Sequence, residues 1–130
     1  MLTSTLTPSR LSLFIVYCVA LVVPLSHSEE PRWVVVDNSS GTKTAIDEGS
    51  ISLVGDIGSA WTAKFNADGS VVLVYQEYNC LSRVARIARF LETSATGVSR
   101  EVDIGEEAKQ WWTVPPVSVM NTMFEAVCRK

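Results

Sequence analysis

The sequence predicts an α+β fold in which an antiparallel sheet carries a C-terminal helix on one face. Short runs rich in β-branched and aromatic residues recur along most of the chain, and turn residues separate them. Only the last residues show a clear helical spacing of apolar side chains. Two cysteines, Cys80 and Cys128, are placed to join that helix to the sheet.

Residues 1–28 have the features of a secretory signal peptide rather than of a folded element. Arg10 is the only charged residue before Glu29, and the apolar run 11–23 follows it. Pro24 ends that run, and 26–28 (Ser-His-Ser) supplies small residues at both positions needed for cleavage. A transmembrane anchor is the alternative, but a spanning helix needs about 20 apolar residues and the run 11–23 is shorter than that.

Cleavage after residue 28 would leave a domain of residues 29–130. Cys18 is not expected to carry a lipid, because Tyr17 precedes it where a small residue is needed and apolar residues continue beyond it. We therefore expect an exported protein, periplasmic, secreted or at the cell surface, without a lipid anchor. It would contact a membrane only through the transient signal peptide.

The composition of residues 29–130 excludes several classes of function. This part contains no histidine, which excludes a Ser-His-Asp triad, a Cys-His pair and a His-ligated metal site. Its 14 acidic residues outnumber its basic ones, so a nucleic-acid-binding surface is not expected. We expect no enzymatic activity, no cofactor and no metal.

Most of the domain is predicted to be β-structure. Turn sequences at 38–41 and 66–69 separate successive runs, and the second turn predicts a hairpin that joins Phe65 to Val71. The expected strands are 33–37, 43–47, 51–55, 61–65 and 71–78.

The segment 83–92 is ambiguous. Its apolar residues fall on one helical face, and neither face is clean if the segment is extended, so periodicity alone slightly favours a helix. A turn at 93–97 and a return strand at 98–102 should follow. The polar segment 103–110 is expected to be a loop.

The C-terminal helix has clear start signals. Pro115 and Pro116 prevent a helix before them, and Ser118 can cap the helix that follows. Its apolar stripe is Met120, Met123, Phe124 and Val127, with Cys128 beside it.

Cys80 and Cys128 are the two cysteines of the expected mature protein. In an exported chain an even number of cysteines indicates disulfide bonds, and two cysteines allow only one disulfide. The bond would hold the apolar face of the helix against the strand that ends at Tyr78. A nucleophilic thiol or a metal pair is a weaker alternative, because no histidine or Cys-x-x-Cys spacing accompanies them.

Several motifs follow one another in the order Tyr78-x-Cys80-x-x-Arg83-x-x-Arg86, Gly97, Trp112-x-x-x-Pro116-x-Ser118 and Cys128, with Trp33 and Ile46-Asp47-x-x-Ser50-Ile51 upstream. Their order and spacing resemble the surface-adhesin protein E family of small exported bacterial domains. The resemblance covers most of residues 33–128.

This resemblance implies a twisted antiparallel sheet of about six strands, with the C-terminal helix tethered by the disulfide. It makes 83–91 a strand and gives Trp112 a place in the core near the start of the helix. It also implies an adhesin-like envelope protein that binds a host extracellular-matrix protein. The alternative is a periplasmic structural or stress-response protein without an external ligand.

Candidate partner-binding residues are Trp111, Arg83 and Arg89. In an extended segment Trp111 would be the exposed ring of the Trp111-Trp112 pair, and exposed tryptophan is favoured at interfaces. The alternative is that Trp111 only lies flat over a neighbouring side chain. Arginines more often pair with nearby acids, and strict alternation would put Arg83 and Arg89 on one face and Arg86 on the other.

Overall fold

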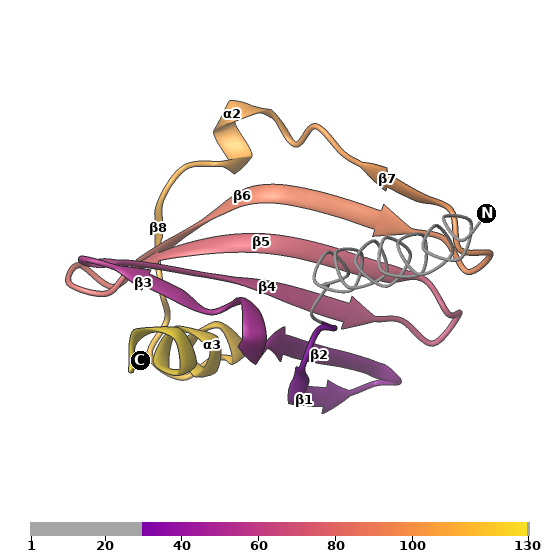
Figure 1. The fold of residues 1–130 in the computed structure, drawn as a ribbon, viewed down its shortest axis with the longest axis horizontal. Helices are drawn as coiled ribbons and strands as arrows, with labels where there is room; N and C mark the ends of the chain where they lie inside the picture. The colour runs from indigo at the N-terminus through magenta and orange to yellow at the C-terminus, as the bar shows by residue number, and fades with distance from the viewer. Residues whose placement is uncertain (1–29, 130) are drawn as a thin grey trace, which may run out of the picture. The chain divides into compact units, whose positions relative to one another are not determined.

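The computed structural model describes residues 30–129, and the predicted signal peptide lies outside these residues. The chain divides into two units, Met1–Glu30 and Pro31–Lys130, and the description that follows concerns the second unit (Figure 1).

An antiparallel sheet forms most of this unit. Its main path has the order β1-β2-β4-β5-β6-β7, while β3 pairs with β4 and β8 pairs with β6. These six strands curl around one face, which confirms the predicted fold class (Figure 1). The strands are β1 (Trp33–Ser39), β2 (Thr42–Asp47), β3 (Ser52–Val54), β4 (Ile57–Phe65), β5 (Val71–Asn79), β6 (Val84–Thr93), β7 (Ser99–Glu101) and β8 (Trp112–Thr113).

The hairpin between β4 and β5 is the one predicted from its turn. Phe65 pairs with Val71, and the Asn66 backbone N–H donates to the Ser70 carbonyl at 2.9 Å. The Asp68 carboxylate accepts hydrogen bonds from the Ser70 N–H and hydroxyl, which closes the turn. These bonds hold the pKa of Asp68 below its usual range.

The segment 83–92 is extended, as the resemblance implied, and the helical interpretation from periodicity alone was wrong. Strand β6 runs from Val84 to Thr93 and pairs with β5 along its whole length. Long-range pairing outweighs local propensity here, because β5 pairs with the whole strand while β8 and β7 pair with its two ends. The expected loop 103–110 also contains a short helix, α2 (Gly105–Ala108).

The C-terminal helix α3 (Val119–Cys128) begins where the sequence predicts. The Ser118 hydroxyl accepts a hydrogen bond from the Asn121 N–H at 3.0 Å and caps the first turn. Met123, Phe124 and Val127 of this helix are buried against the sheet.

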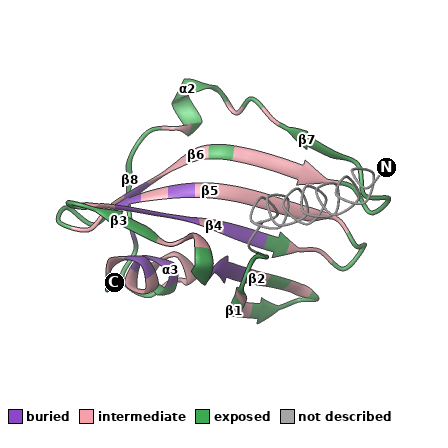
Figure 2. Cartoon of the chain, in the orientation of Figure 1, coloured by how far each residue is buried: buried purple, intermediate pink, exposed green. Residues whose placement is uncertain are grey.

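The core therefore lies at one end of the sheet, under α3 (Figure 2). Tyr78 is fully buried there and packs edge-on against Phe124, with 6.2 Å between ring centroids. Burial raises the pKa of Tyr78 far above its usual range, so its hydroxyl stays neutral.

Two features fix α3 against this end of the sheet. The predicted disulfide joins Cys80, just after β5, to Cys128 at the end of the helix, with 5.6 Å between their Cα atoms. Gly58 on β4 lets the helix come close, because a Cβ at this position would overlap Cγ1 of Val127. The contact therefore requires glycine at position 58 for steric reasons.

Candidate functional site

A β-bulge in β6 decides where the arginines point. Tyr75 pairs with Arg89 and the next residue, Gln76, pairs with Ile87, so Ala88 is an extra residue in the ladder. The extra residue reverses the alternation, and Arg86 and Arg89 therefore lie on the same face of the sheet. The prediction that these two arginines face opposite sides was wrong, because it assumed an uninterrupted strand.

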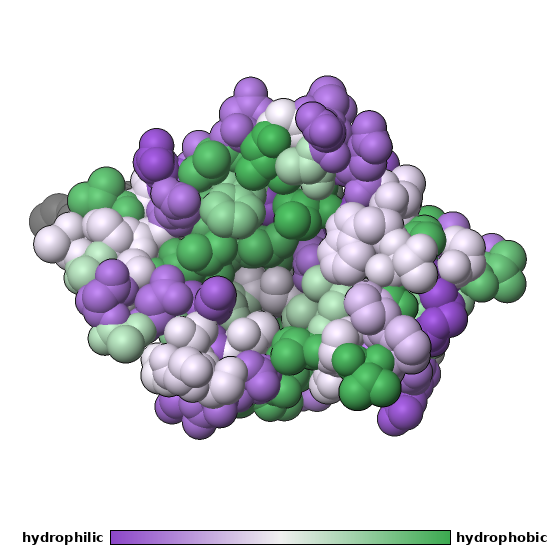
Figure 3. Space-filling view, turned by 180° about the vertical axis from the view of Figure 1, so that it is seen from behind, coloured by the Kyte–Doolittle hydropathy of each residue, from purple (hydrophilic) through white to green (hydrophobic). Residues whose placement is uncertain are grey.

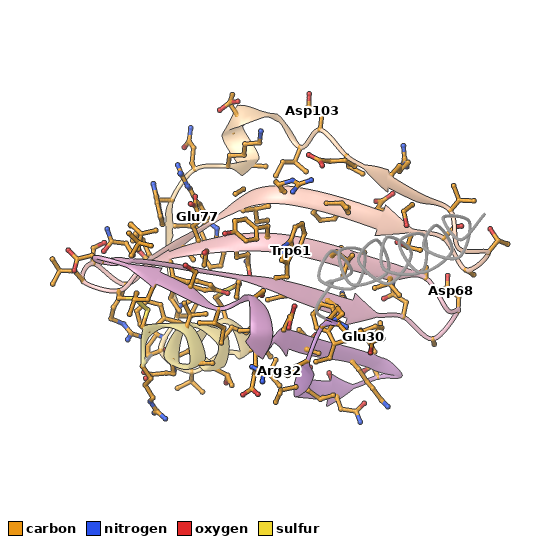
Figure 4. All side chains as sticks on the ribbon, viewed as in Figure 1. Glu30, Arg32, Trp61, Asp68, Glu77 and Asp103 are labelled. Atoms are coloured by element: carbon orange, nitrogen blue, oxygen red, sulfur yellow. A yellow bond between two sulfur atoms is a disulfide. The ribbon has the colours of Figure 1, made fainter. Side chains whose placement is uncertain are left out.

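Both arginines stack on aromatic rings on this face. The Arg86 guanidinium lies 4.7 Å from the centroid of the Trp111 ring, and the Arg89 guanidinium lies 5.4 Å from the centroid of Trp61. Trp61 also packs against Tyr75 across the β4–β5 ladder, at 5.2 Å between centroids. We call Trp61, Tyr75, Arg86, Arg89 and Trp111 the aromatic–arginine face; Figure 4 labels Trp61 on it.

Two acidic side chains neutralise the arginines of this face. Arg86 Nε donates to Glu77 Oε1 at 2.7 Å, and Arg89 donates to Glu101 Oε1 at 2.6 Å. The hydrogen bond from Arg89 holds the pKa of Glu101 below its usual range, and the same bond raises the pKa of Arg89. The aromatic–arginine face thus presents rings and guanidinium planes with little net charge.

Arg83 belongs to a different part of the molecule. It has a positive φ of 56° in the turn before β6, and its guanidinium lies 4.6 Å from the centroid of Phe124 in α3. It donates to Asn121 Oδ1 at 2.6 Å and lies near Glu125. Arg83 therefore contacts the helix, and the prediction that it shares a face with Arg89 was wrong.

The two adjacent tryptophans are exposed to nearly the same degree. Trp111 is 38% exposed and Trp112 is 36% exposed, so Trp112 is not the core residue that the resemblance implied. The core position in this segment belongs to Val114, which is 2% exposed and whose N–H donates to the Arg83 carbonyl. Trp112 pairs with the buried Ala85 and lies on the α3 side of the sheet, away from Trp111.

Trp61 and Tyr75 were not singled out from the sequence, although a signal for them exists. The predicted hairpin joins Phe65 to Val71, and counting back four pairs places Trp61 opposite Tyr75. Pairs of aromatic residues at directly opposite positions stabilise antiparallel strands. The bulge at Ala88, which brings Arg89 to this pair, has no comparable sequence signal.

Within residues 30–129, no three or more acidic, cysteine or histidine side chains are grouped so that they could hold a metal ion. The helices of the described part are also too short or too polar to cross a membrane.

No protein-family model, curated protein or solved structure matches this chain. The similarity to the surface-adhesin protein E family therefore stays a prediction from the motifs.

Proposed function

We propose that this chain is an exported, non-enzymatic binding module of the bacterial envelope, and that it recognises a protein partner through the aromatic–arginine face. The observation that carries the proposal is the stacking of three aromatic rings and two guanidinium groups in one layer. Tryptophan, tyrosine and arginine are the residue types that contribute most to protein interfaces.

The geometry of this layer favours binding in two ways. The ion pairs and ring contacts hold Arg86 and Arg89 in place, which lowers the entropy lost when a partner orders them. Because both charges are paired, the face suits an uncharged protein surface better than an acidic polymer such as a charged polysaccharide.

Export is supported by the disulfide, since such bonds persist in oxidising compartments. The motif resemblance adds the class of partner, a host extracellular-matrix protein. The proposal is therefore an adhesin-like module, and a periplasmic protein without an external ligand is the outcome that would replace it.

The test is a binding screen of the purified protein against a panel of extracellular-matrix proteins. Trp111→Ala should weaken the binding that is found by about thirtyfold or more, as expected for a central interface residue. Trp112→Ala is the matched control, because Trp112 has similar exposure but lies outside the aromatic–arginine face. Both variants should keep the thermal stability of the native protein.

Three results would contradict the proposal: no binding to any member of the panel, equal losses for the two variants, or unfolding of Trp111→Ala. Cell fractionation separates the two candidate functions independently. Recovery at the surface or in the culture medium supports adhesion, whereas strictly periplasmic recovery supports the structural or stress-response role.

A further inference from the structure

A hollow of about 340 Å³ lies on the other face of the sheet, next to α3. In Figure 3, hydrophobic side chains gather around a recess in the middle of the surface. The apolar lining includes Val72, Val74, Ile87 and Phe90 from the sheet and Met120 and Met123 from the helix. This volume lies within the range of small-molecule sites, which are usually apolar with a few polar groups.

One buried polar side chain faces this hollow with spare hydrogen-bonding capacity. Gln76 is 4% exposed and lines the hollow, and its Oε1 accepts a hydrogen bond from the Tyr78 hydroxyl at 3.0 Å. Its amide N–H groups donate to none of the described residues. No buried side-chain nitrogen or oxygen of the described residues lacks a hydrogen-bond partner, so the Gln76 amide nitrogen is open to the hollow and can donate to a ligand oxygen.

A cation lies at the opposite end of the hollow. Lys64 is exposed and lines it, and it makes no ion pair with another residue of 30–129. Lys64 is paired with Val72, which is four residues before Gln76 on β5, so the backbone positions that carry the two polar side chains are about 13 Å apart along the strand. The nearest acid in the register, Glu92, is already paired with Arg100 at 3.1 Å.

We propose that this hollow binds a medium-chain carboxylic acid whose far end carries a hydroxyl or carbonyl oxygen. The carboxylate would lie beside Lys64, the chain would lie on the apolar lining, and the terminal oxygen would accept a hydrogen bond from Gln76. The spacing of these two positions corresponds to about ten bonds of an extended chain. Met120 and Met123 suit such a ligand, because flexible thioether side chains adapt to a flexible chain.

The same contacts argue against a peptide as the occupant. An extended peptide of this length would bring several backbone N–H and C=O groups into the hollow, and each needs a partner. The lining provides few polar groups: beside Gln76 and Lys64 it has Thr44 and Thr62, and the Thr62 hydroxyl already donates to the Val74 carbonyl. An acyl chain has no such groups between its ends.

This inference does not depend on the proposed function, because the two sites lie on opposite faces of the sheet. Its test is isothermal titration calorimetry of the purified protein with three probes below their micelle concentrations. We expect saturable 1:1 binding of 10-hydroxydecanoate, weaker binding of decanoate and still weaker binding of decyltrimethylammonium, whose cationic head group Lys64 repels. Absence of binding by both acids, or equal binding of the cationic probe, would overturn the inference.

Two lysine variants locate the carboxylate. Lys64→Met should weaken binding of both acids by about two- to fivefold, the range for an exposed ion pair. Lys43→Met is the matched control, because Lys43 is also exposed but pairs with Phe65 and points to the other face. Equal effects of the two substitutions would refute the placement of the ligand.

The role of Gln76 is tested in two ways. Gln76→Leu should remove the preference for 10-hydroxydecanoate over decanoate, which we expect to be about tenfold for a buried hydrogen bond. Because this substitution also removes the partner of the Tyr78 hydroxyl, the native protein supplies a second measurement. The side-chain amide signal of Gln76 in a ¹⁵N–¹H NMR spectrum should shift on saturation with 10-hydroxydecanoate, and an unmoved signal would overturn the assignment.

Discussion

The close approach of α3 to β4 at Gly58 gives a quantitative prediction about stability. In Gly58→Ala, the new methyl group would overlap Cγ1 of Val127, while its next neighbours, Leu53 Cδ1 and the Ser52 carbonyl, stay at ordinary contact distances of 3.5 and 3.6 Å. Val127 is fully buried, and the helix is tethered by the disulfide at the next residue, so neither can easily move.

Inserting a methyl group into a packed core typically costs 1–3 kcal/mol. Replacing glycine also restricts the unfolded chain, which offsets about 0.4–1 kcal/mol of that cost. We therefore expect Gly58→Ala to lower the free energy of unfolding by about 1–2 kcal/mol. Urea denaturation of the oxidised protein, followed by circular dichroism, measures this change.

The double variant Gly58→Ala/Val127→Ala tests whether the overlap is the cause. Val127→Ala alone removes two buried methyl groups and should cost about 1.6 kcal/mol in lost burial, plus a term for the cavity. The methyl group of Ala at position 58 would then fill part of that cavity, so the double variant should be no less stable than Val127→Ala. Additive effects within about 0.5 kcal/mol would refute the steric explanation.

Three further predictions concern the helix and the ion pairs. Reduction of the disulfide, which closes a loop of 48 residues, should lower the free energy of unfolding by about 4 kcal/mol in the chain-entropy model, measured by urea denaturation with and without reductant. Ser118→Ala removes the cap that accepts the Asn121 N–H and should cost about 1 kcal/mol, again by urea denaturation; an unchanged midpoint would contradict it. Arg89 holds the pKa of Glu101 in the folded protein below its value in the unfolded chain. The ion pair therefore stabilises the folded protein fully at pH values above the usual pKa of glutamate, and this stabilisation is lost as the pH falls through the lowered pKa. Between pH 6 and pH 3, the free energy of unfolding should therefore fall less steeply for Glu101→Gln than for the native protein.

The elements with strong local signals could be predicted from the sequence. The turn at 66–69 and the start of α3 are determined by hydrogen bonds and proline residues within a few positions of each other, so they do not depend on the rest of the fold. The pairing of Cys80 with Cys128 followed from counting cysteines and placing the helix stripe.

The interrupted strand was the part that sequence reasoning could not resolve. In β6, Ala85, Ile87 and Phe90 face α3, so their spacing changes from two to three residues at the bulge. The bulge breaks the strict alternation of apolar residues that identifies a strand, so the segment carried no clear two-residue period in the sequence. Trp112 was misplaced because β8 has only two residues, too few for a periodic signal.

The position of Ala88 has a consequence for how the aromatic–arginine face is inherited. A homologue could keep both arginines at this spacing and still lose the face if its strand paired without the bulge, because residues three apart in a regular strand point to opposite sides. Deletion of the extra residue would leave the arginines two apart, which keeps them on one face of a regular strand. Comparisons among divergent sequences should therefore consider how this strand pairs together with the number of residues between the two arginines.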